Sequence, residues 1–239
     1  MTAEKLTLTV KKKITDDWAS AFPSLEIWKP MWLVRRHGPM LYGICLDRAA
    51  QQDAYIPTVF THCLASPFPV ISLTGRAFVP DRAGQPTKIR LMSHAEKLPM
   101  IADLLLKRHP ALVNGDLTLD DLLSHYYALL RGAYGVQSPY MTSHFAAMAL
   151  SASVLGQKDV ARGVVDRAAE IMKLWPEGVN TAFGPAARWV EQMLDQISHP
   201  AALHEFVREE VGKHKLNGLR DRGLGIFSGS RVDIEGLGG

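Results

Sequence analysis

The spacing of apolar residues changes near residue 93, and this change limits the folds that the chain can adopt. Residues 1–92 contain short apolar runs separated by turn residues, a pattern typical of β-strands. Residues 93–215 carry apolar side chains three and four positions apart, which is typical of amphipathic helices. Strands followed by helices, without alternation between the two, predict an α+β fold in which an N-terminal antiparallel sheet packs against a C-terminal helical half.

We expect four to six antiparallel strands in the first part of the chain. Lys5 to Lys11 alternates between apolar and polar side chains and predicts the first strand. The turn residues His37-Gly38-Pro39 predict a β-hairpin between the apolar runs on either side of them. The runs that predict the remaining strands lie at residues 31–35, 40–46, 58–64, 69–74, 78–80 and 88–92.

The helical part is expected to contain six helices and to share one continuous core with the sheet, so that residues 1–239 form a single α+β domain. Ser93 followed by Glu96 is a capping-box pattern and predicts the start of the first long helix. Residues 216–239 are rich in glycine and lack periodicity, so we expect a tail that is partly extended or mobile.

Composition and charge exclude several classes of protein. A hydrophobic content of 47% predicts a folded chain rather than a disordered one, and a net charge of +3 is too small to indicate a nucleic-acid partner. No apolar run approaches the ~20 residues that span a bilayer, so no membrane partner is expected. The N-terminus shows no signal-peptide pattern, which favours a cytoplasmic location.

Neither a metal site nor a cofactor site is predicted. Histidines His199 and His204 are five positions apart, which turns them about 140° from each other on a helix and prevents both from binding one ion. The glycines between Gly223 and Gly229 follow no strand and do not form a phosphate-binding loop. The two cysteines, Cys45 and Cys63, both lie in apolar runs and are expected to be buried free thiols.

One group of residues predicts a protein-binding surface. Tryptophan, tyrosine and arginine dominate binding hot spots because they are large, rigid and able to form hydrogen bonds. Ten residues contain Trp28, Trp32, Arg35, Arg36 and His37, and Tyr42 and Tyr55 follow closely in the sequence. The residues that we expect to contact a partner are Trp32, Arg35, Arg36, Tyr42 and Tyr55. The alternative interpretation is an amphipathic core strand with a basic end.

Two other functions remain open. One is a small enzyme with a thiol centre built on Cys63, His62 and His94, which requires a lowered pKa for the cysteine. Adjacent strand residues point to opposite faces, so His62 could not itself activate Cys63. The other is a helical scaffold that binds peptides. The small residues Gly156, Ala161 and Ala168, with Pro176 beyond, are spaced as in a tetratricopeptide unit, but no second copy follows and a plain helical hairpin is favoured.

The stretches Trp28-Lys29-Pro30, Arg35-Arg36-His37-Gly38-Pro39 and Gly43-Ile44-Cys45-Leu46 resemble the opening of certain bacterial immunity proteins. Tyr55-Ile56-Pro57-Thr58 and Val70-Ile71-Ser72-Leu73 continue this resemblance, which covers about residues 28–74. Such proteins neutralise a toxin that is delivered between competing cells, for example by type VI secretion. The resemblance implies a cytoplasmic protein without enzymatic activity, whose partner is a cognate toxin. It gives no oligomeric state.

Overall fold

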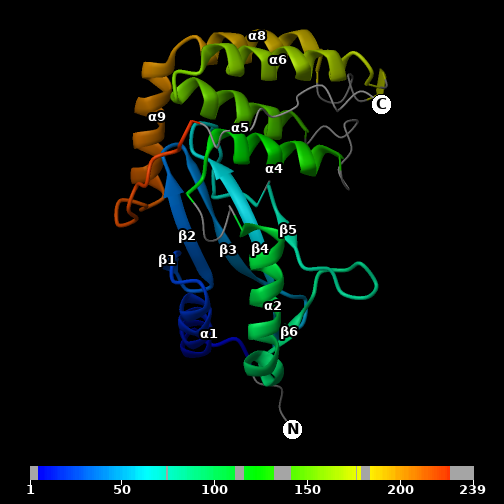
Figure 1. Ribbon diagram of the computed structural model, residues 1–239, viewed down its shortest axis with the longest axis vertical. Coiled ribbons are helices and arrows are strands. Elements are labelled where there is room, and N and C mark those ends of the chain that lie inside the picture. The colour runs from blue at the N-terminus through cyan, green and yellow to red at the C-terminus, as the bar shows by residue number, and fades with distance from the viewer. Residues whose placement is uncertain are drawn as a thin grey trace.

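A computed structural model describes residues 5–73, 75–110, 116–131, 141–175, 177–178 and 184–226, and it confirms the α+β fold. An antiparallel sheet is followed by a helical half that packs at one end of the strands (Figure 1). The strands are β1 (Glu26–Lys29), β2 (Trp32–His37), β3 (Met40–Arg48), β4 (Ala54–Cys63), β5 (Ala77–Phe78) and β6 (Ile89–Arg90). Their order in the sheet is β1-β2-β3-β4-β5, and β6 also pairs with β4.

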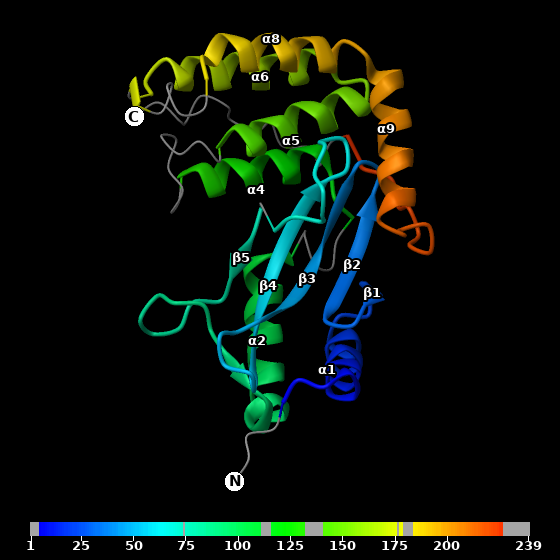
Figure 2. The same cartoon turned by 180° about the vertical axis from the view of Figure 1, so that it is seen from behind.

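Helices cover the sheet in two places. Helices α1 (Leu8–Ala21) and α2 (His94–Arg108) pack against one face of the strands, and Figure 2 shows the opposite face from behind. The helical half contains α4 (Leu119–Arg131), α5 (Met141–Val154), α6 (Lys158–Met172), α8 (Ala186–Ile197) and α9 (Pro200–Lys213). None of the helices in the described ranges combines the length and the apolar character that a membrane span requires.

The predicted first strand at Lys5 to Lys11 is wrong, because helix α1 begins at Leu8. Thr7 caps this helix, with its side-chain oxygen accepting a hydrogen bond from the backbone N–H of Val10 at 3.3 Å. The short alternation of apolar residues matched a strand, but the apolar residues Ile14 and Trp18 extend the pattern at helical spacing and are both buried. Tertiary packing of that stripe therefore decided the local structure.

The other strand predictions have mixed outcomes. The hairpin across His37-Gly38-Pro39 is confirmed as β2 and β3, with Gly38 at a φ of 53° in the turn. Residues 69–73 form no strand, and residue 74 lies outside the described residues. In the predicted last hairpin, residues 78–92, the chain does reverse its direction, and a bridge joins Pro80 to Pro86. Its two strands, β5 and β6, each pair with β4 rather than with each other.

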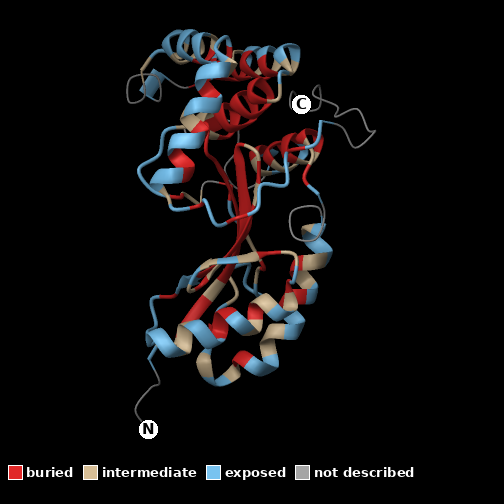
Figure 3. Ribbon diagram, turned by 90° about the vertical axis from the view of Figure 1, so that its left-hand side faces the viewer, coloured by how far each residue is buried: buried red, intermediate tan, exposed pale blue. Residues whose placement is uncertain are grey.

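A single cluster of buried side chains runs through the sheet and the helices. Figure 3 shows the strands buried along most of their length. Helices α5 and α6 form the predicted hairpin, with Gly156 at a φ of 72° between them and Ala161 and Ala168 fully buried at their contact. Pro176, which was part of the same pattern, lies outside the described residues.

The start of the glycine-rich tail, residues 216–226, is held against the rest of the protein by bridges and hydrogen bonds. This segment, the C-terminal strap, pairs with β2 through Arg36 and with the start of α4 through Thr118. The carboxylate of Asp221 accepts hydrogen bonds from the backbone N–H groups of Gly38 at 2.8 Å and Gly223 at 3.0 Å. Residues 227–239 of the predicted tail lie outside the described residues.

Candidate functional site

Three of the five predicted contact residues are buried and cannot form a surface for a partner. Tyr42 and Tyr55 are fully buried and Arg35 is 2% exposed. The Arg35 guanidinium donates hydrogen bonds to the backbone oxygen of Ser24 at 2.9 Å and to the hydroxyl of Tyr42 at 3.0 Å. The alternative interpretation, a core strand with a basic residue, therefore describes Arg35 correctly. A charged group inside the protein needs such partners.

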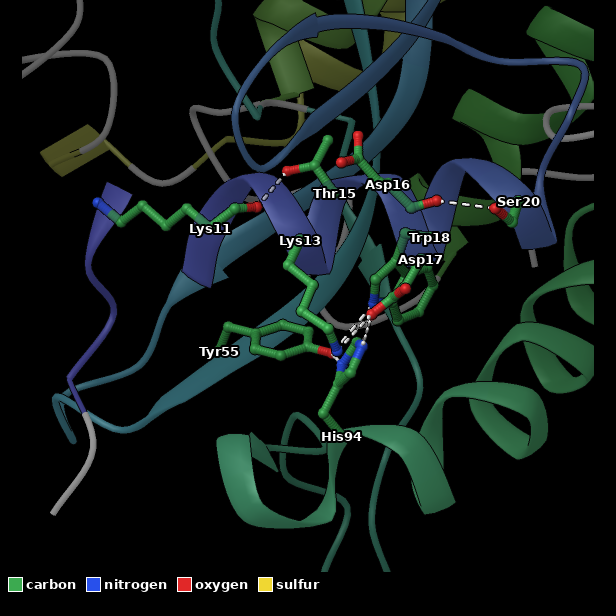
Figure 4. Close-up of polar contacts among 9 residues, drawn as sticks. All are labelled: Lys11, Lys13, Thr15, Asp16, Asp17, Trp18, Ser20, Tyr55 and His94. Carbon is green, nitrogen blue, oxygen red and sulfur yellow. Dashed lines mark hydrogen bonds and ion pairs between the residues drawn. The ribbon is translucent and has the colours of Figure 1, made fainter. Parts of the chain in front are cut away.

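Tyr55 and His94 belong to a hydrogen-bonded chain between β4, α1 and α2 (Figure 4). The indole of Trp18 donates to the Tyr55 hydroxyl at 3.0 Å, and this hydroxyl lies 2.6 Å from Nδ1 of His94. Nε2 of His94 lies 3.0 Å from the Asp17 carboxylate. Burial raises the pKa of the Tyr55 hydroxyl, which lies between the indole and the imidazole. The chain ties two helices to the sheet.

Arg36 and Trp32 remain nearer the surface, but Arg36 is engaged. Its guanidinium forms an ion pair with Asp221 of the C-terminal strap at 2.9 Å, and its backbone oxygen accepts from the N–H of Arg222 at 3.1 Å. Arg36 therefore holds the strap in place. Of the predicted contact residues, only Trp32 combines a partly exposed side chain with freedom from such an ion pair.

The Trp32 ring reaches across the neighbouring strand, β3, to a ring of β4. Trp32 and Phe60 lie on β2 and β4, with β3 between them, so their backbones are about 10 Å apart. Their ring centroids nevertheless approach to 5.1 Å. Gly43 of β3 lies directly between Val34 and Phe60 in the register, and it has no side chain to separate the two rings. The contact fixes Trp32 on the face opposite to α1.

A β-bulge in β1 brings Trp28 and Lys29 to the same side. Ile27 pairs with Leu33, but the next pair is Lys29 with Trp32, so β1 contains one extra residue at this point. In a regular strand, Trp28 and Lys29 would point to opposite faces, whereas a bulge sets two residues against one on the partner strand. Both therefore lie opposite Trp32. Regular alternation of side chains along a strand does not predict this arrangement, because a bulge interrupts the alternation.

Trp28, Lys29 and Trp32 form what we call the aromatic corner, which is supported from below by Phe60. The two indole rings are 5.5 Å apart and stand at 88° to each other. The Lys29 ammonium lies 4.0 Å from the centroid of Trp28 and 4.7 Å from that of Trp32. Both rings are partly exposed and Lys29 is exposed. Rigid aromatic side chains beside a cation at a sheet edge are typical of a binding hot spot.

Two carboxylates lie on the same face as the aromatic corner. Glu26 pairs with Val34 and Asp47 follows Cys45 by two positions, and both registers match the face of Trp32. Oε2 of Glu26 accepts from the backbone N–H of Arg220 at 3.3 Å, whereas its buried Oε1 has no hydrogen-bond partner among the residues that the structure describes. This face therefore carries two acidic residues as well as the aromatic corner.

The residues of the predicted thiol centre are not brought together. His62 and Cys63 lie on opposite faces of β4, as predicted from strand geometry: the imidazole contacts Phe68 and His214, and the thiol lies 3.7 Å from the hydroxyl of Ser151. His94 contacts Tyr55, which is eight residues and about 26 Å along the same strand from Cys63. Burial raises the pKa of the Cys63 thiol, which is the opposite of what a nucleophile requires.

Cys63 and Cys45 are expected to react slowly with iodoacetamide in the native protein and fast after denaturation, because both are buried and burial raises the pKa of Cys45 to about 12. Mass spectrometry of the labelled protein in 0 M and in high urea measures both rates. Rapid native labelling at Cys63, with Cys45 unlabelled in the same sample, would restore the enzyme hypothesis.

A groove is present at the helical half, where a peptide scaffold would need one. A cleft of about 320 Å³ lies between the segment after β4 and helices α8 and α9, and Pro67, Leu203 and Phe206 are among its lining residues. Its apolar walls are compatible with a peptide, but no charged anchor beyond Asp195 and His199 defines a ligand. The aromatic corner is the better defined site.

Comparisons with protein-family models, with curated proteins and with solved structures found no match to this chain. Among the residues that the structure describes, no three His, Cys, Asp or Glu side chains are placed to hold a metal ion. The function must therefore be argued from the geometry of the sites themselves.

Proposed function

We propose that this protein binds and neutralises a protein toxin in the cytoplasm, and that the aromatic corner is part of the contact surface. The observation that supports the proposal is the gathering of two partly exposed tryptophans and one lysine at the edge of the sheet. Tryptophan is among the residues that contribute most to protein interfaces. The resemblance of residues 28–74 to immunity proteins supplies the kind of partner. On this proposal, the chain acts by binding rather than by catalysis.

The partner is identified by purifying the tagged protein from its source organism and analysing co-purified proteins by mass spectrometry. A cognate toxin is expected to bind with a fixed stoichiometry, to stop growth when it is expressed alone, and to be harmless when this chain is co-expressed. A bound protein that does not harm cells would contradict toxin neutralisation.

Trp28→Ala and Trp32→Leu are each expected to weaken that complex about 30-fold, which corresponds to about 2 kcal/mol, because each removes an aromatic anchor. Isothermal titration calorimetry measures the affinity, and thermal unfolding monitored by circular dichroism shows that each variant is folded. The matched control is Met92→Ala, which removes an apolar side chain that is 84% exposed outside the corner. Unchanged affinity in both tryptophan variants would remove the aromatic corner from the interface.

A further inference from the structure

The aromatic corner already holds a cation, and that cation belongs to the protein itself. Across the part of the chain that the structure describes, the Lys29 ammonium forms neither an ion pair nor a hydrogen bond. Its close contacts are the faces of two perpendicular indole rings, at 4.0 and 4.7 Å. A ring face attracts a cation electrostatically within about 6 Å of its centroid. The corner therefore has the geometry of a cation-binding site.

Lysine is a poor permanent occupant of this site. Burial lowers the pKa of Lys29, which shows that the strongly hydrated ammonium is partly removed from water when it rests on the rings. The side chain is nevertheless exposed at the sheet edge and can swing out into solvent. A guanidinium group is planar and more weakly hydrated, so it stacks on aromatic rings at a smaller cost in hydration.

The rings do not need Lys29 to hold their positions. Trp32 is supported by Phe60 at 5.1 Å, and Trp28 packs on Trp32 at 5.5 Å. The bulge and the strand pairing that present both rings are backbone features. A cation that displaces Lys29 would therefore enter a preformed site.

We propose that the aromatic corner is a receptor for an arginine side chain of the protein partner, and that Lys29 is a built-in competitor that occupies the site until the partner displaces it. That the guanidinium group comes from an arginine of a protein partner rests on the proposed function. The preference of the corner for a guanidinium group is a property of this chain alone, and it can be tested without any partner.

The test follows the indole N–H signals of the full-length, ¹⁵N-labelled protein by NMR during titration with L-argininamide at constant ionic strength. In Lys29→Ala, the signals of Trp28 and Trp32 are expected to shift and saturate, with a midpoint at least fivefold lower than in the wild type. The signals of the other three tryptophans, Trp18, Trp175 and Trp189, are expected to stay in place. Adding Trp28→Leu to Lys29→Ala is expected to abolish saturation.

Lys88→Ala is the matched control, because it removes an exposed lysine that contacts no aromatic ring in the described structure. Its midpoint should equal that of the wild type. The absence of saturable shifts in Lys29→Ala, or equal midpoints in Lys29→Ala and the wild type, would overturn the proposal. A second titration uses tetramethylammonium, and tighter binding of this probe than of argininamide would also overturn the assignment to arginine. Because no partner is present, failure here leaves the toxin-binding experiment unaffected.

Discussion

Gly43→Ala is expected to unfold the protein or to lower its free energy of unfolding by more than about 4 kcal/mol. A Cβ atom at this position would lie 1.9 Å from the backbone oxygen of Leu33 and 2.9 Å from Cα of Val34. Both atoms belong to the backbone of β2, so relief requires β2 and β3 to separate. Overpacking against side chains costs about 1–3 kcal/mol, and contact with backbone exceeds that range. Urea denaturation of the wild type and the variant measures the difference.

Gly163→Ala is the matched control for this experiment. Gly163 lies inside α6, and a Cβ atom there would meet nothing within 4 Å. Alanine favours a helix over glycine by about 1 kcal/mol, so this variant should be more stable than the wild type. A Gly43→Ala protein with wild-type stability would show that β2 and β3 are not held as closely as the structure describes, and the approach of Trp32 to Phe60 would need another cause.

Acid is expected to destabilise the protein strongly because two histidines are buried in their neutral form. Burial lowers the pKa of His62 and of His144 to about 4, whereas histidine in an unfolded chain titrates near pH 6.5. Between these values the unfolded state binds more protons, so stability is fully present above pH 6.5 and falls as the pH falls towards 4. These two groups alone should lower the free energy of unfolding by about 5 kcal/mol between pH 7.5 and 4.5. Burial also lowers the pKa of His125 to about 4, which adds to the loss.

Urea denaturation at several pH values measures this loss. His62→Gln is expected to remove about 2.5 kcal/mol of it, because the uncharged amide does not titrate. Near His62, His214 and Lys213 also oppose its protonation, whereas Glu210 favours it. The control is His204→Gln, which changes an exposed histidine and should leave the pH dependence unaltered. A His62→Gln variant with the full wild-type pH dependence would show that carboxylates, rather than this histidine, cause the acid sensitivity.

The fold class follows from the sequence because hydrophobic periodicity is a local signal. The hairpin of β2 and β3 was predictable from His37-Gly38-Pro39, and the change to helical spacing near residue 93 marks the start of α2 at His94. A short helical stretch from Thr15 through Trp18 was predicted, but the first turns of α1 were missed because Leu6, Leu8 and Val10 satisfy a two-residue period over too short a distance. The four-residue spacing from Ile14 to Trp18 decides the structure instead.

The candidate site was only partly predictable, since the sequence does not show which face of a strand is covered. Trp32 and Arg35 are three positions apart in β2 and point to opposite faces. Trp32 is partly exposed, whereas Arg35 is buried and donates a hydrogen bond to the backbone oxygen of Ser24. Tyr55 is similarly buried by Trp18 of helix α1, whose first residues were predicted as a strand. Lys29 was missed because a bulge breaks the alternation on which strand predictions depend.

The C-terminal strap also affects how the chain is completed during synthesis. Its contact with His37 joins residues 186 positions apart, through the imidazole Nδ1 and the backbone oxygen of Gly223 at 2.7 Å. All strands and all helices of the described structure precede the strap in the chain. A growing chain can therefore form its sheet on the ribosome while the β2–β3 turn still lacks its last partner. An early-made end of the sheet thus receives some of its contacts from a segment that is translated late.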